Sequence, residues 1–521
     1  GLLAHGVKAG DRVGLLFPNT PEAVIAFLAI AYIGALSVPL YSGFGADAVA
    51  RRLVDSEASC LIASTGFVRR GKRYSLEEVA RSAIKLMPAP ARLVMVGGSS
   101  GTGHVRWEDL ESVDGSELAP AGTLATDPFM VIYTSGTSGK PKGAVHAHAG
   151  FPLRVAQDVC FLFDFRPGDR FFWFSDMGWM VGPFSICSTL LLKGALVLYD
   201  GAPNAPDISR LRSVAARSGT THFGSTPTAI RAMAAEEAAV MAIEAPSIRV
   251  LMTGGEVMDA ETHRWFFKRF GAGILPILNY SGGTEVSGAL LTNVMLLDIQ
   301  PCRFNSIALG VSAGLYVEGR LVQAGEEGEL GINLPFNGKC LTFWQDDARY
   351  LETYWLQSSD IWMHGDLALR EEDGQYLIIG RSDDVMKISG KRVGPSEVEG
   401  VVTEDTRIAE AVAFSVPDAR SGEAMILFVV PAAGTMWREG ELSEHVSALL
   451  RTKMGPSYKP STVVTLEKLM RTKNGKLVRR LAKQAWLGVE AGDLTAVEDP
   501  SYYSVMRNYC QMVQDRKAIP A

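Results

Sequence analysis

Residues 133–148 read YTSGTSGKPKGAVHAH, and the centre of this stretch is built from glycines, hydroxyl side chains and lysines. From Thr134 to Gly143 there are three glycines, four hydroxyl side chains and two lysines. Glycine lets a backbone approach a ligand closely, hydroxyls donate to oxygen, and lysines supply positive charge. This mixture predicts a loop that binds a polyphosphate.

The stretch is not a P-loop, because that motif requires Ser or Thr directly after its Gly-Lys pair. Here Lys140 is followed by Pro141, so the hydroxyl that would hold magnesium is absent. The proline also prevents a helix from running straight out of the glycine turn. The alternative is an ordinary Gly/Ser/Thr surface loop. We favour a phosphate-binding loop of another design, because two lysines and two apolar flanks, FMVIY and GAVHAH, accompany the run.

Length and composition limit the classes of protein to which the chain can belong. The chain has 521 residues, which is too long for one hydrophobic core. Hydrophobic residues make up 47% and charged residues 21%, an ordinary globular composition. The net charge of −6 gives no basic surface for nucleic acid. The six cysteines are scattered without a C-x-x-C pair, which is typical of a reducing compartment, so we expect a cytoplasmic protein.

Residues 23–41, AVIAFLAIAYIGALSVPLY, form an uncharged run of 19 residues that has the length of a transmembrane helix. We instead predict a helix beginning at Pro21-Glu22, a break at Gly34 and a buried strand in ALSVPLY. We therefore expect no stable membrane insertion. The chain opens at Gly1 within what reads as a helix end, a turn and a strand, so we also expect that the N-terminal part of the large domain is missing.

Short apolar runs alternate with helical stretches through the first two thirds of the chain. This alternation predicts α/β layers with largely parallel sheets, whose ligands bind at the carboxyl ends of strands. After about residue 320 the runs become shorter and alternate more, which indicates a partly antiparallel sheet. We predict a large α/β domain over 1–382 and a small, mobile α+β domain over 383–521, with the boundary in GRSDDVMK. The alternative for that segment is a plain hairpin turn.

Four further stretches carry residues suited to chemistry: FFWFSDMGWMVGPF (171–184), NYSGGTEVSG (279–288), HGDLALREEDGQYLIIGRSDDVMKISGKRVGPSEVEG (364–400) and RTKNGKLVRR (471–480). Considered singly, each has a structural explanation: aromatic core, a glycine turn, solvated charges and a basic helix start. Together with YTSGTSGKPKG they resemble the adenylate-forming superfamily of acyl-CoA synthetases, peptide-synthetase adenylation domains and luciferases. The motifs occur in the family's order, and the resemblance covers about residues 1–497. FWFSDMGWMVGP, THFGSTPTAIRAM and LGVEAGDLTAVEDP look like the acetyl-CoA synthetase branch.

The resemblance implies ATP, Mg²⁺ and coenzyme A as ligands, and it implies site residues. Three residues would act in catalysis, and one of them, Glu285, would also ligate the metal: Lys476, Thr284 and Glu285. The nucleotide would contact Thr134, Ser135, Gly136, Thr137, Ser138, Gly139, Lys140, Lys142, Gly255, Glu256, Val257, Asn279, Tyr280, Ser281, Gly282, Gly283, Asp366, Arg381 and Arg392. The acyl pocket would be lined by Trp179, Met180, Val181, Gly254 and Gly282. CoA would contact Gly390 and Arg451, and Asp383 would be the hinge.

These residues suit the reaction that the resemblance implies. An ionised Asp366 can accept two hydrogen bonds from ribose hydroxyls. Mg²⁺ needs few carboxylates, so Glu285 can serve. Lys476 can sit between the incoming carboxylate and the α-phosphate, and stabilise charge in the transition state. The small domain would then rotate about Asp383 for the thioester step.

One departure from the family pattern concerns the acid. Acetate-specific members look like WWQTETG where this chain has SGGTEVSG, so Gly282 stands in the place of a tryptophan. A missing tryptophan opens a large volume, which predicts an acid longer than acetate. The alternative is that Met180 or Phe184 fills the space and that the chain is an acetyl-CoA synthetase proper.

Three other functions stay open at this stage. The first is an adenylate-forming ligase with a different thiol acceptor, although no carrier domain follows. The second is a nucleotide-binding regulatory protein, which the intact Lys476, Glu285 and Asp366 disfavour. The third is a membrane-anchored fatty-acid importer built around residues 23–41. We also expect that the segment before Gly1 contributes to CoA binding.

Overall fold

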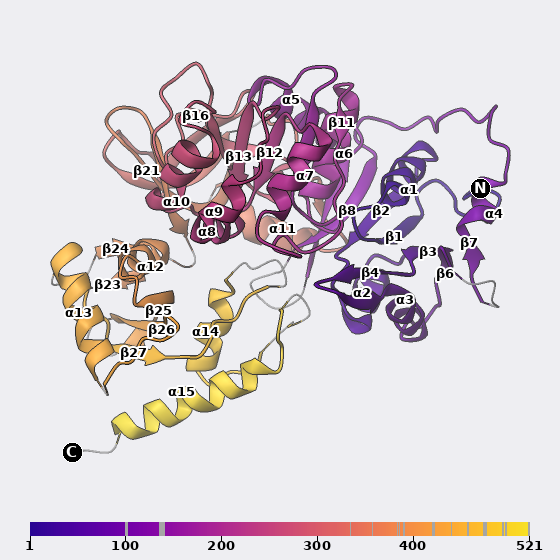
Figure 1. The fold of residues 1–521 in the computed structure, drawn as a ribbon. Helices are drawn as coiled ribbons and strands as arrows, with labels where there is room; N and C mark the ends of the chain where they lie inside the picture. The colour runs from indigo at the N-terminus through magenta and orange to yellow at the C-terminus, as the bar shows by residue number, and fades with distance from the viewer. Residues whose placement is uncertain are drawn as a thin grey trace. The chain divides into compact units, whose positions relative to one another are not determined.

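The computed structural model describes residues 1–98, 103–134, 141–333, 335–356, 358–382, 384, 386–388, 391–418, 422–438, 440–455, 458–472, 477–491, 494 and 497–518. The chain divides into two compact units (Figure 1). The first comprises Gly1–Gly136, Pro141–Ala313 and Ile332–Trp362, and the second comprises chiefly Gly314–Gly331 and Met363–Ala521. Residues 363–382 thus cluster with the C-terminal segment, so these units do not follow the boundary at 382/383, which stays a prediction.

The first unit contains an eight-stranded sheet with a parallel centre. In spatial order its strands are β20 (Thr342–Phe343), β9 (Lys142–Ala147), β8 (Pro128–Thr134), β2 (Leu36–Leu40), β1 (Arg12–Leu16), β3 (Cys60–Ser64), β6 (Arg92–Val96) and β7 (Val105–Arg106). Among the described residues its antiparallel pairs are β8–β9 and β9–β20, so β9 runs against the direction of the other strands. A separate hairpin joins β4 (Gly66–Arg69) to β5 (Lys72–Ser75).

A seven-stranded sheet follows, and it carries most of the predicted site. Its order is β11 (Ala195–Leu196), β10 (Arg170–Trp173), β12 (His222–Ser225), β13 (Val250–Gly254), β14 (Ile277–Gly282), β15 (Ala289–Thr292) and β16 (Ser306–Ile307). The first five strands are parallel, and β15 and β16 are antiparallel. The prediction of layered α/β sheets with largely parallel strands is confirmed.

Helices of the first unit cover these sheets. They are α1 (Pro21–Tyr32), α2 (Ala46–Asp55), α3 (Leu76–Lys85), α4 (Trp107–Glu111), α5 (Gly150–Phe161), α6 (Val181–Leu191), α7 (Arg210–Ser218), α8 (Pro227–Ala235), α9 (Glu237–Met241), α10 (Ala260–Trp265) and α11 (Asp347–Tyr354), with a π turn η1 (Phe266–Phe270) and a 3₁₀ turn η2 (Thr284–Val286). One face of the second sheet packs against α7, α8, α9 and η1. On the other face Trp173 and Tyr280 meet Phe184 of α6 and Phe163.

The uncharged run at residues 23–41 folds as a helix and a strand, as predicted. Pro21 occupies the first turn of α1, where its missing N–H is not needed. Gly34 takes a left-handed φ of 72°, and all five residues of β2 are buried. No helix among the described residues is long and apolar enough to cross a membrane.

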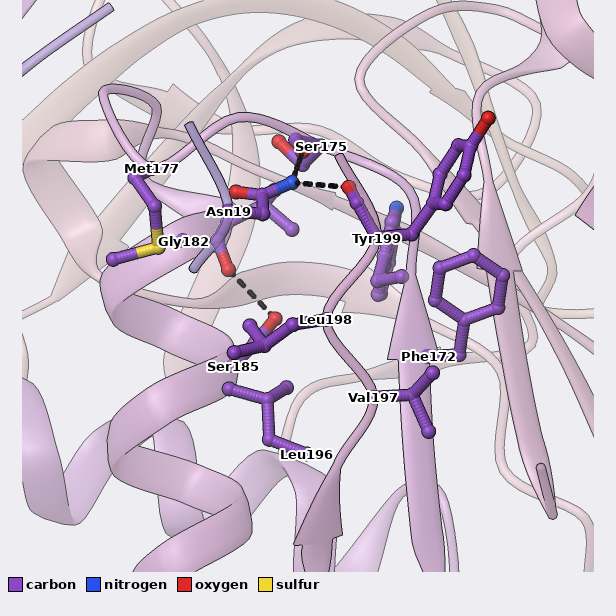
Figure 2. Close-up of a pocket in the computed structure, with 12 residues that line it drawn as sticks. Asn19, Phe172, Ser175, Met177, Gly182, Ser185, Leu196, Val197, Leu198 and Tyr199 are labelled. Carbon is purple, nitrogen blue, oxygen red and sulfur yellow. Dashed lines mark hydrogen bonds between the residues drawn. The ribbon is translucent and has the colours of Figure 1, made fainter. Parts of the chain in front are cut away.

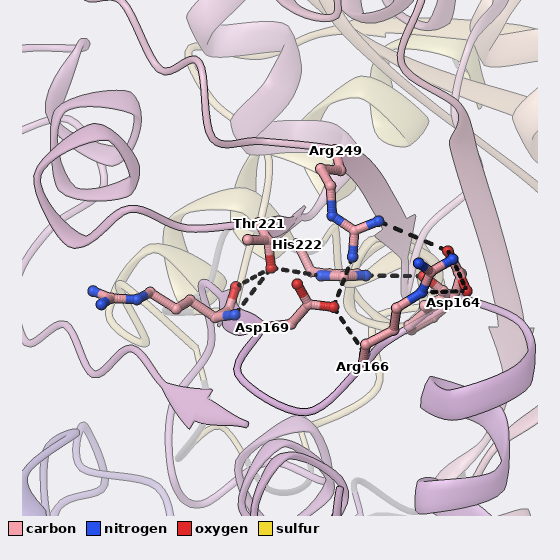
Figure 3. A network of polar contacts seen from close by, with 8 residues as sticks. Asp164, Arg166, Asp169, Thr221, His222 and Arg249 are labelled. Carbon is pink, nitrogen blue, oxygen red and sulfur yellow. Dashed lines mark hydrogen bonds and ion pairs between the residues drawn. The ribbon is translucent and has the colours of Figure 1, made fainter. Parts of the chain in front are cut away.

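A polar network ties together the amino ends of β10, β12 and β13 (Figure 3). Asp169 accepts hydrogen bonds from the backbone N–H of Arg166 at 2.8 Å and from Nη2 of Arg249 at 2.7 Å. The Thr221 hydroxyl lies 2.8 Å from Nδ1 of the buried His222. These contacts fix the end of the sheet that lies opposite the carboxyl ends of the strands.

The second unit contains a five-stranded sheet and a smaller C-terminal part. The sheet has the order β18 (Arg320–Leu321), β17 (Ser312–Val317), β19 (Glu327–Asn333), β21 (Ile361–Arg370) and β22 (Tyr376–Arg381). The C-terminal part contains a hairpin of β23 (Met386–Ile388) and β24 (Lys391–Val393), and a sheet of β25 (Ile408–Asp418), β26 (Gly422–Pro431) and β27 (Thr462–Thr465). Its helices are α12 (Pro395–Thr403), α13 (Glu441–Lys453), α14 (Arg479–Trp486) and α15 (Tyr502–Ala518). The predicted shift to partly antiparallel strands is confirmed, but the prediction that they are shorter is wrong. β21, β25 and β26 have 10, 11 and 10 residues, because antiparallel hairpin partners such as β25 and β26 pair along their whole length.

Candidate active site

Predicted nucleotide-binding residues gather where β13 and β14 end. Gly254 and Tyr280 are register partners at the carboxyl ends of these parallel strands. Beyond β13 the chain turns at Gly255, whose φ of 86° suits glycine. The Glu256 carboxylate then accepts a 2.6 Å hydrogen bond from the Thr228 hydroxyl, and Val257 is exposed. The turn after β13 and the end of β14 therefore form one edge, as expected for ligands of parallel sheets.

The alternation of side chains along β14 separates the predicted residues. Tyr280 points into the aromatic core between α5 and α6, and its hydroxyl donates to Asp158 at 2.7 Å. Asn279 and Ser281 point to the opposite face, because successive side chains of a strand alternate. The Tyr280 side chain is therefore occupied in the core, and a contact of this residue with the nucleotide, which stays a prediction, would come from its backbone.

Thr284 and Glu285 lie in the 3₁₀ turn η2, between β14 and β15. The carbonyl of Glu285 accepts a 2.7 Å hydrogen bond from the backbone N–H of Cys340. The half-buried Glu285 carboxylate has no hydrogen bond or ion pair to any residue that the structure describes. Mg²⁺ is commonly bound by one or two carboxylates together with substrate phosphates. An unpaired, partly buried carboxylate therefore fits this ion.

Gly282 does not leave a tryptophan-sized space. The strand pair β14–β15 is irregular between Ser281 and Gly282, and the turn folds back over Gly282. A Cβ at this position would overlap the carbonyl oxygen of Gly288. Backbone therefore fills the direction in which a side chain at Gly282 would project, and the glycine does not by itself show an open acyl pocket. The larger acyl pocket stays a prediction. The neighbouring Gly283 is half-buried and precedes η2.

The signature loop connects the antiparallel strands β8 and β9. Thr134 and Lys142 are register partners at the end of the two strands that adjoins the loop. The ammonium of Lys142 lies 5.3 Å from the ring centre of Phe343, 5.9 Å from that of Tyr354 and 3.5 Å from the Thr353 hydroxyl. These contacts compete with the predicted role of Lys142 at a phosphate. The remaining loop residues, Ser135, Gly136, Thr137, Ser138, Gly139 and Lys140, lie outside the described residues.

The aromatic and Gly-rich stretch 171–184 forms one wall of a recess (Figure 2). The recess holds about 330 Å³ of empty space, including the part open to solvent. Val181 and Gly182 line it at the start of α6, and Leu198 and Tyr199 line the facing wall. Its other lining residues are Asn19, Phe172, Trp173, Ser175, Met177, Ser185, Leu196 and Val197. Gly182 is thus the glycine of this stretch that lies at the recess.

Two other predicted pocket residues lie beside the recess, without lining it. Trp179 packs against Tyr41, with ring centres 5.5 Å apart, and Met180 caps the start of α6. The buried indole N–H of Trp179 has no hydrogen-bond partner among the described residues.

In the second unit, Asp366 and Arg381 face each other across β21 and β22. Arg381 Nη1 lies 3.3 Å from Asp366 Oδ1 and donates to the His364 carbonyl at 3.0 Å. The structure thus brings together the two residues that were assigned to the ribose. Arg451 is exposed in the last turn of α13. Arg392 lies in β24, but its side chain is not described; Asp383, Gly390 and Lys476 lie outside the described residues.

Sequence reasoning missed the buried polar residues that support the site. Asp176 accepts hydrogen bonds from the Ser42 hydroxyl at 2.5 Å and from the Gly178 backbone at 2.9 Å, and burial raises the pKa of its carboxyl. His146 of β9 lies 3.0 Å from the Ser287 hydroxyl, beyond η2. No local signal distinguishes such residues from exposed ones, because burial depends on contacts far along the chain.

Comparisons with known proteins agree with this arrangement. A family model described as AMP-binding enzyme matches residues 1–340, and one described as AMP-binding enzyme C-terminal domain matches residues 397–476. An acetyl-coenzyme A synthetase of Pyrobaculum arsenaticum is 32% identical over 515 residues, which cover 95% of this chain and 76% of that protein. One from Methanothrix thermoacetophila is 32% identical over 513 residues, with 96% of this chain and 78% of that protein covered.

Solved structures show the same fold. An acetoacetyl-CoA synthetase from Streptomyces lividans has a TM-score of 0.90 and 27% identity, covering 99% of this chain and 79% of that one. An anthranilate CoA ligase in complex with anthranoyl-AMP has a TM-score of 0.80 at 24% identity, over 93% of this chain and 89% of that one, which is a likeness of fold alone. The chain belongs to the adenylate-forming AMP-binding enzymes, in the acetyl-CoA synthetase-like branch, and is an AMP-forming acid–CoA ligase.

Proposed function

We propose that the chain activates a short-chain carboxylic acid larger than acetate and transfers its acyl group to CoA. In the first half-reaction an oxygen of the carboxylate bonds to the α-phosphorus of ATP. The bond from that phosphorus to the bridging oxygen of the β-phosphate breaks, and pyrophosphate leaves. In the second half-reaction the CoA sulfur bonds to the acyl carbon and AMP leaves. Both steps depend mainly on positioning and on neutralising charge.

The residues around β14 would hold the triphosphate end of ATP. Glu285 would ligate Mg²⁺, and Thr284 would donate its hydroxyl to a phosphate oxygen. Mg²⁺, when bound, supplies the charge neutralisation that phosphoryl transfer needs. The edge formed by Gly255, Glu256 and Asn279 would receive the adenine. This assignment is supported by the position of these residues at the carboxyl ends of β13 and β14.

The second unit would hold the ribose and supply the catalytic lysine. Asp366 would accept the ribose hydroxyls, beside the Arg381 guanidinium that lies 3.3 Å from its Oδ1. Lys476 would neutralise charge between the acid and the α-phosphate. Rotation about Asp383 would then exchange this face for the one that carries Gly390. Arg392 would contact phosphate in the first state, and Arg451 would contact a phosphate of CoA.

One observation carries the size of the acid: the recess beside Val181 and Gly182. The recess is partly open to solvent and lies at the start of α6, where the sequence predicts the acyl pocket. Its walls are mainly apolar, which suits an aliphatic or keto acid longer than acetate. The likeness to an acetoacetyl-CoA synthetase supports such a substrate.

Acetate itself is the second candidate, because the curated relatives at 32% identity are named acetyl-coenzyme A synthetase. Preference for one acid over another by chain length is expected to be modest, since one methylene contributes roughly 1–3 kcal/mol. We also propose a cytoplasmic location, supported by six cysteines that are all free of disulfides.

Pyrophosphate release across a panel of acids tests the proposal. ATP and Mg²⁺ would be offered with acetate, propionate, butyrate, acetoacetate and benzoate, with and without CoA. The proposed function predicts release that peaks with an acid larger than acetate, and a thioester only when CoA is present. A clear preference for acetate would establish the second candidate. Release that forms no thioester with CoA would indicate a different acceptor.

A further inference from the structure

A fully buried ion pair lies beneath the turn that carries Glu285. Arg154 and Asp158 occupy successive turns of α5, with Nη2 and Oδ1 2.9 Å apart and side-chain exposures of 1% and 0%. Removing two charges from water is costly unless further hydrogen bonds satisfy them. The partners of this pair therefore reveal what the pair holds in place.

The pair bonds to the two strands that flank the turn. Asp158 accepts from the Tyr280 hydroxyl of β14 at 2.7 Å and from the Ala289 backbone N–H of β15 at 2.9 Å. Arg154 donates to the Ala289 carbonyl at 2.7 Å and to the Leu309 carbonyl at 2.8 Å. The base of the β14–β15 hairpin is thus fixed from both sides by α5.

Two glycines leave room for the pair. A Cβ at Gly288 would lie 2.5 Å from Asp158 Oδ2 and 2.8 Å from Arg154 Nε. A Cβ at Gly338 would lie 2.6 Å from Arg154 Cγ, and the φ of Gly338 is 103°. Gly288 and Gly338 therefore leave the space that the Arg154 side chain occupies. A side chain at either position would collide with Arg154.

The tip of the same hairpin is held separately. Ser287 donates to the Gly338 carbonyl at 2.5 Å, and His146 lies 3.0 Å from the Ser287 hydroxyl. Cys340 donates its backbone N–H to the Glu285 carbonyl at 2.7 Å. Glu285 lies at this tip, and its backbone is held by Cys340. Its side chain has no hydrogen bond or ion pair among the described residues, so the contacts that the structure shows for Glu285 hold its backbone.

We propose that Arg154 and Asp158 are positioning residues for the metal-binding carboxylate of Glu285. This inference rests on the proposed function of Glu285. If the pair is broken, the base of the hairpin can shift, and Glu285 no longer points to the site of Mg²⁺ at the phosphates. Partners that orient a ligand typically change metal affinity by about 10–100-fold.

The test is the contribution of Mg²⁺ to ATP binding, measured by calorimetry as the ratio of dissociation constants without and with the ion. Asp158→Asn keeps the shape and removes the charge. We expect its ratio to fall about tenfold or more below that of the wild type, toward the value of Glu285→Gln. Metal-free ATP binding should stay within about twofold of the wild type, because the adenine edge at β13 does not contact Asp158.

Asp169→Asn is the matched control. Asp169 also bonds to an arginine, Arg249, but at the amino ends of the strands (Figure 3). This variant should lose stability and keep the wild-type ratio. Tyr280→Phe removes one hydrogen bond to Asp158 and leaves the ion pair. It should lower the ratio by a smaller factor, and it replaces Asp158→Asn if that variant does not fold.

The possible results distinguish a failure of the positioning role from a failure of the proposed metal site. Wild-type ATP binding that does not respond to Mg²⁺ would contradict the proposed metal site at Glu285. A wild-type response that survives in Asp158→Asn and Tyr280→Phe would overturn the positioning role alone. Equal losses of metal-free and metal-bound affinity would also overturn it, because they indicate a general loss of structure.

Discussion

The carbonyl oxygen of Gly288 occupies the position that a Cβ on Gly282 would need. The two residues meet because β14 and β15 are irregular at Ser281, so that the turn folds back on the strand. Glycine at position 282 is therefore required by the local backbone. Its presence does not by itself describe the size of the acyl pocket.

Gly282→Ala should destabilise the protein by about 1–3 kcal/mol, the usual cost of overpacking. Adenylation should fall as well, because the turn that must move carries Glu285. Urea unfolding and pyrophosphate release measure the two effects. Gly122→Ala is the control, since a Cβ at Gly122 meets nothing within 4 Å. A Gly282→Trp variant that folds normally and gains a preference for acetate would contradict this interpretation.

Glu285→Gln should lower Mg²⁺-dependent pyrophosphate release by about 100-fold or more, because a neutral amide supplies no charge to a cation at the phosphates. The fold should be preserved, since the backbone carbonyl of Glu285, and not its carboxylate, bonds to Cys340. Initial rates over a range of Mg²⁺ concentrations give the measurement. Glu261→Gln, at an exposed position of α10, is the control and should keep the wild-type rate. Wild-type activity in Glu285→Gln would exclude the metal role.

Asp366→Asn should weaken ATP binding about tenfold, because the amide accepts fewer hydrogen bonds from ribose and loses its charge pairing with Arg381. Calorimetric titration with ATP measures the change. The comparison variant is Glu372→Gln, an exposed side chain between β21 and β22. If both variants bind ATP equally well, Asp366 does not contact the ribose.

Stability should fall as the pH is lowered below about 6.5, the ordinary pKa of histidine. Burial lowers the pKa of His146 to about 3 and that of His263 to about 4. Between these values and 6.5 the unfolded chain binds more protons than the folded one, so the free energy of unfolding decreases with falling pH. Each histidine contributes about 1.4 kcal/mol per pH unit within its window.

Urea unfolding at pH 7, 6 and 5 measures this slope. Replacing His263 by Gln should make the decline shallower, because one titrating group is removed. Burial raises the carboxyl pKa of Asp176, so this group opposes the histidine slope as it protonates. The difference in slope between the wild type and the His263 variant therefore isolates His263. Equal slopes in the two proteins would contradict the burial of His263 as a neutral side chain.

Much of the fold follows from local patterns. The break at Gly34 and the buried run ALSVPLY predicted α1 and β2, and the alternation of short apolar runs with helical stretches predicted the layered α/β sheets. Hydrophobic periodicity and glycine positions depend on residues that are neighbours in the sequence, so they predict helices and strands without knowledge of the tertiary structure. The same holds for the motifs that identified the family.

The direction of side chains was harder to predict. Tyr280 was assigned to the nucleotide and lies in the core, because the register of β14 places it on the opposite face from Asn279 and Ser281. A shift of one residue along a strand reverses the face of every side chain. Lys142 was assigned to phosphate, and its ammonium instead lies over the rings of Phe343 and Tyr354.

The sequence by itself determined the family and the alternation of helices and strands, and it supplied the proposed site residues, because each depends on a short, contiguous pattern. Only the tertiary structure decided what supports those residues. Arg154 and Asp158 look like any surface pair four residues apart on a helix, until β14, β15 and Gly338 bury them. Burial is created by segments more than a hundred residues away, so no local pattern carries it.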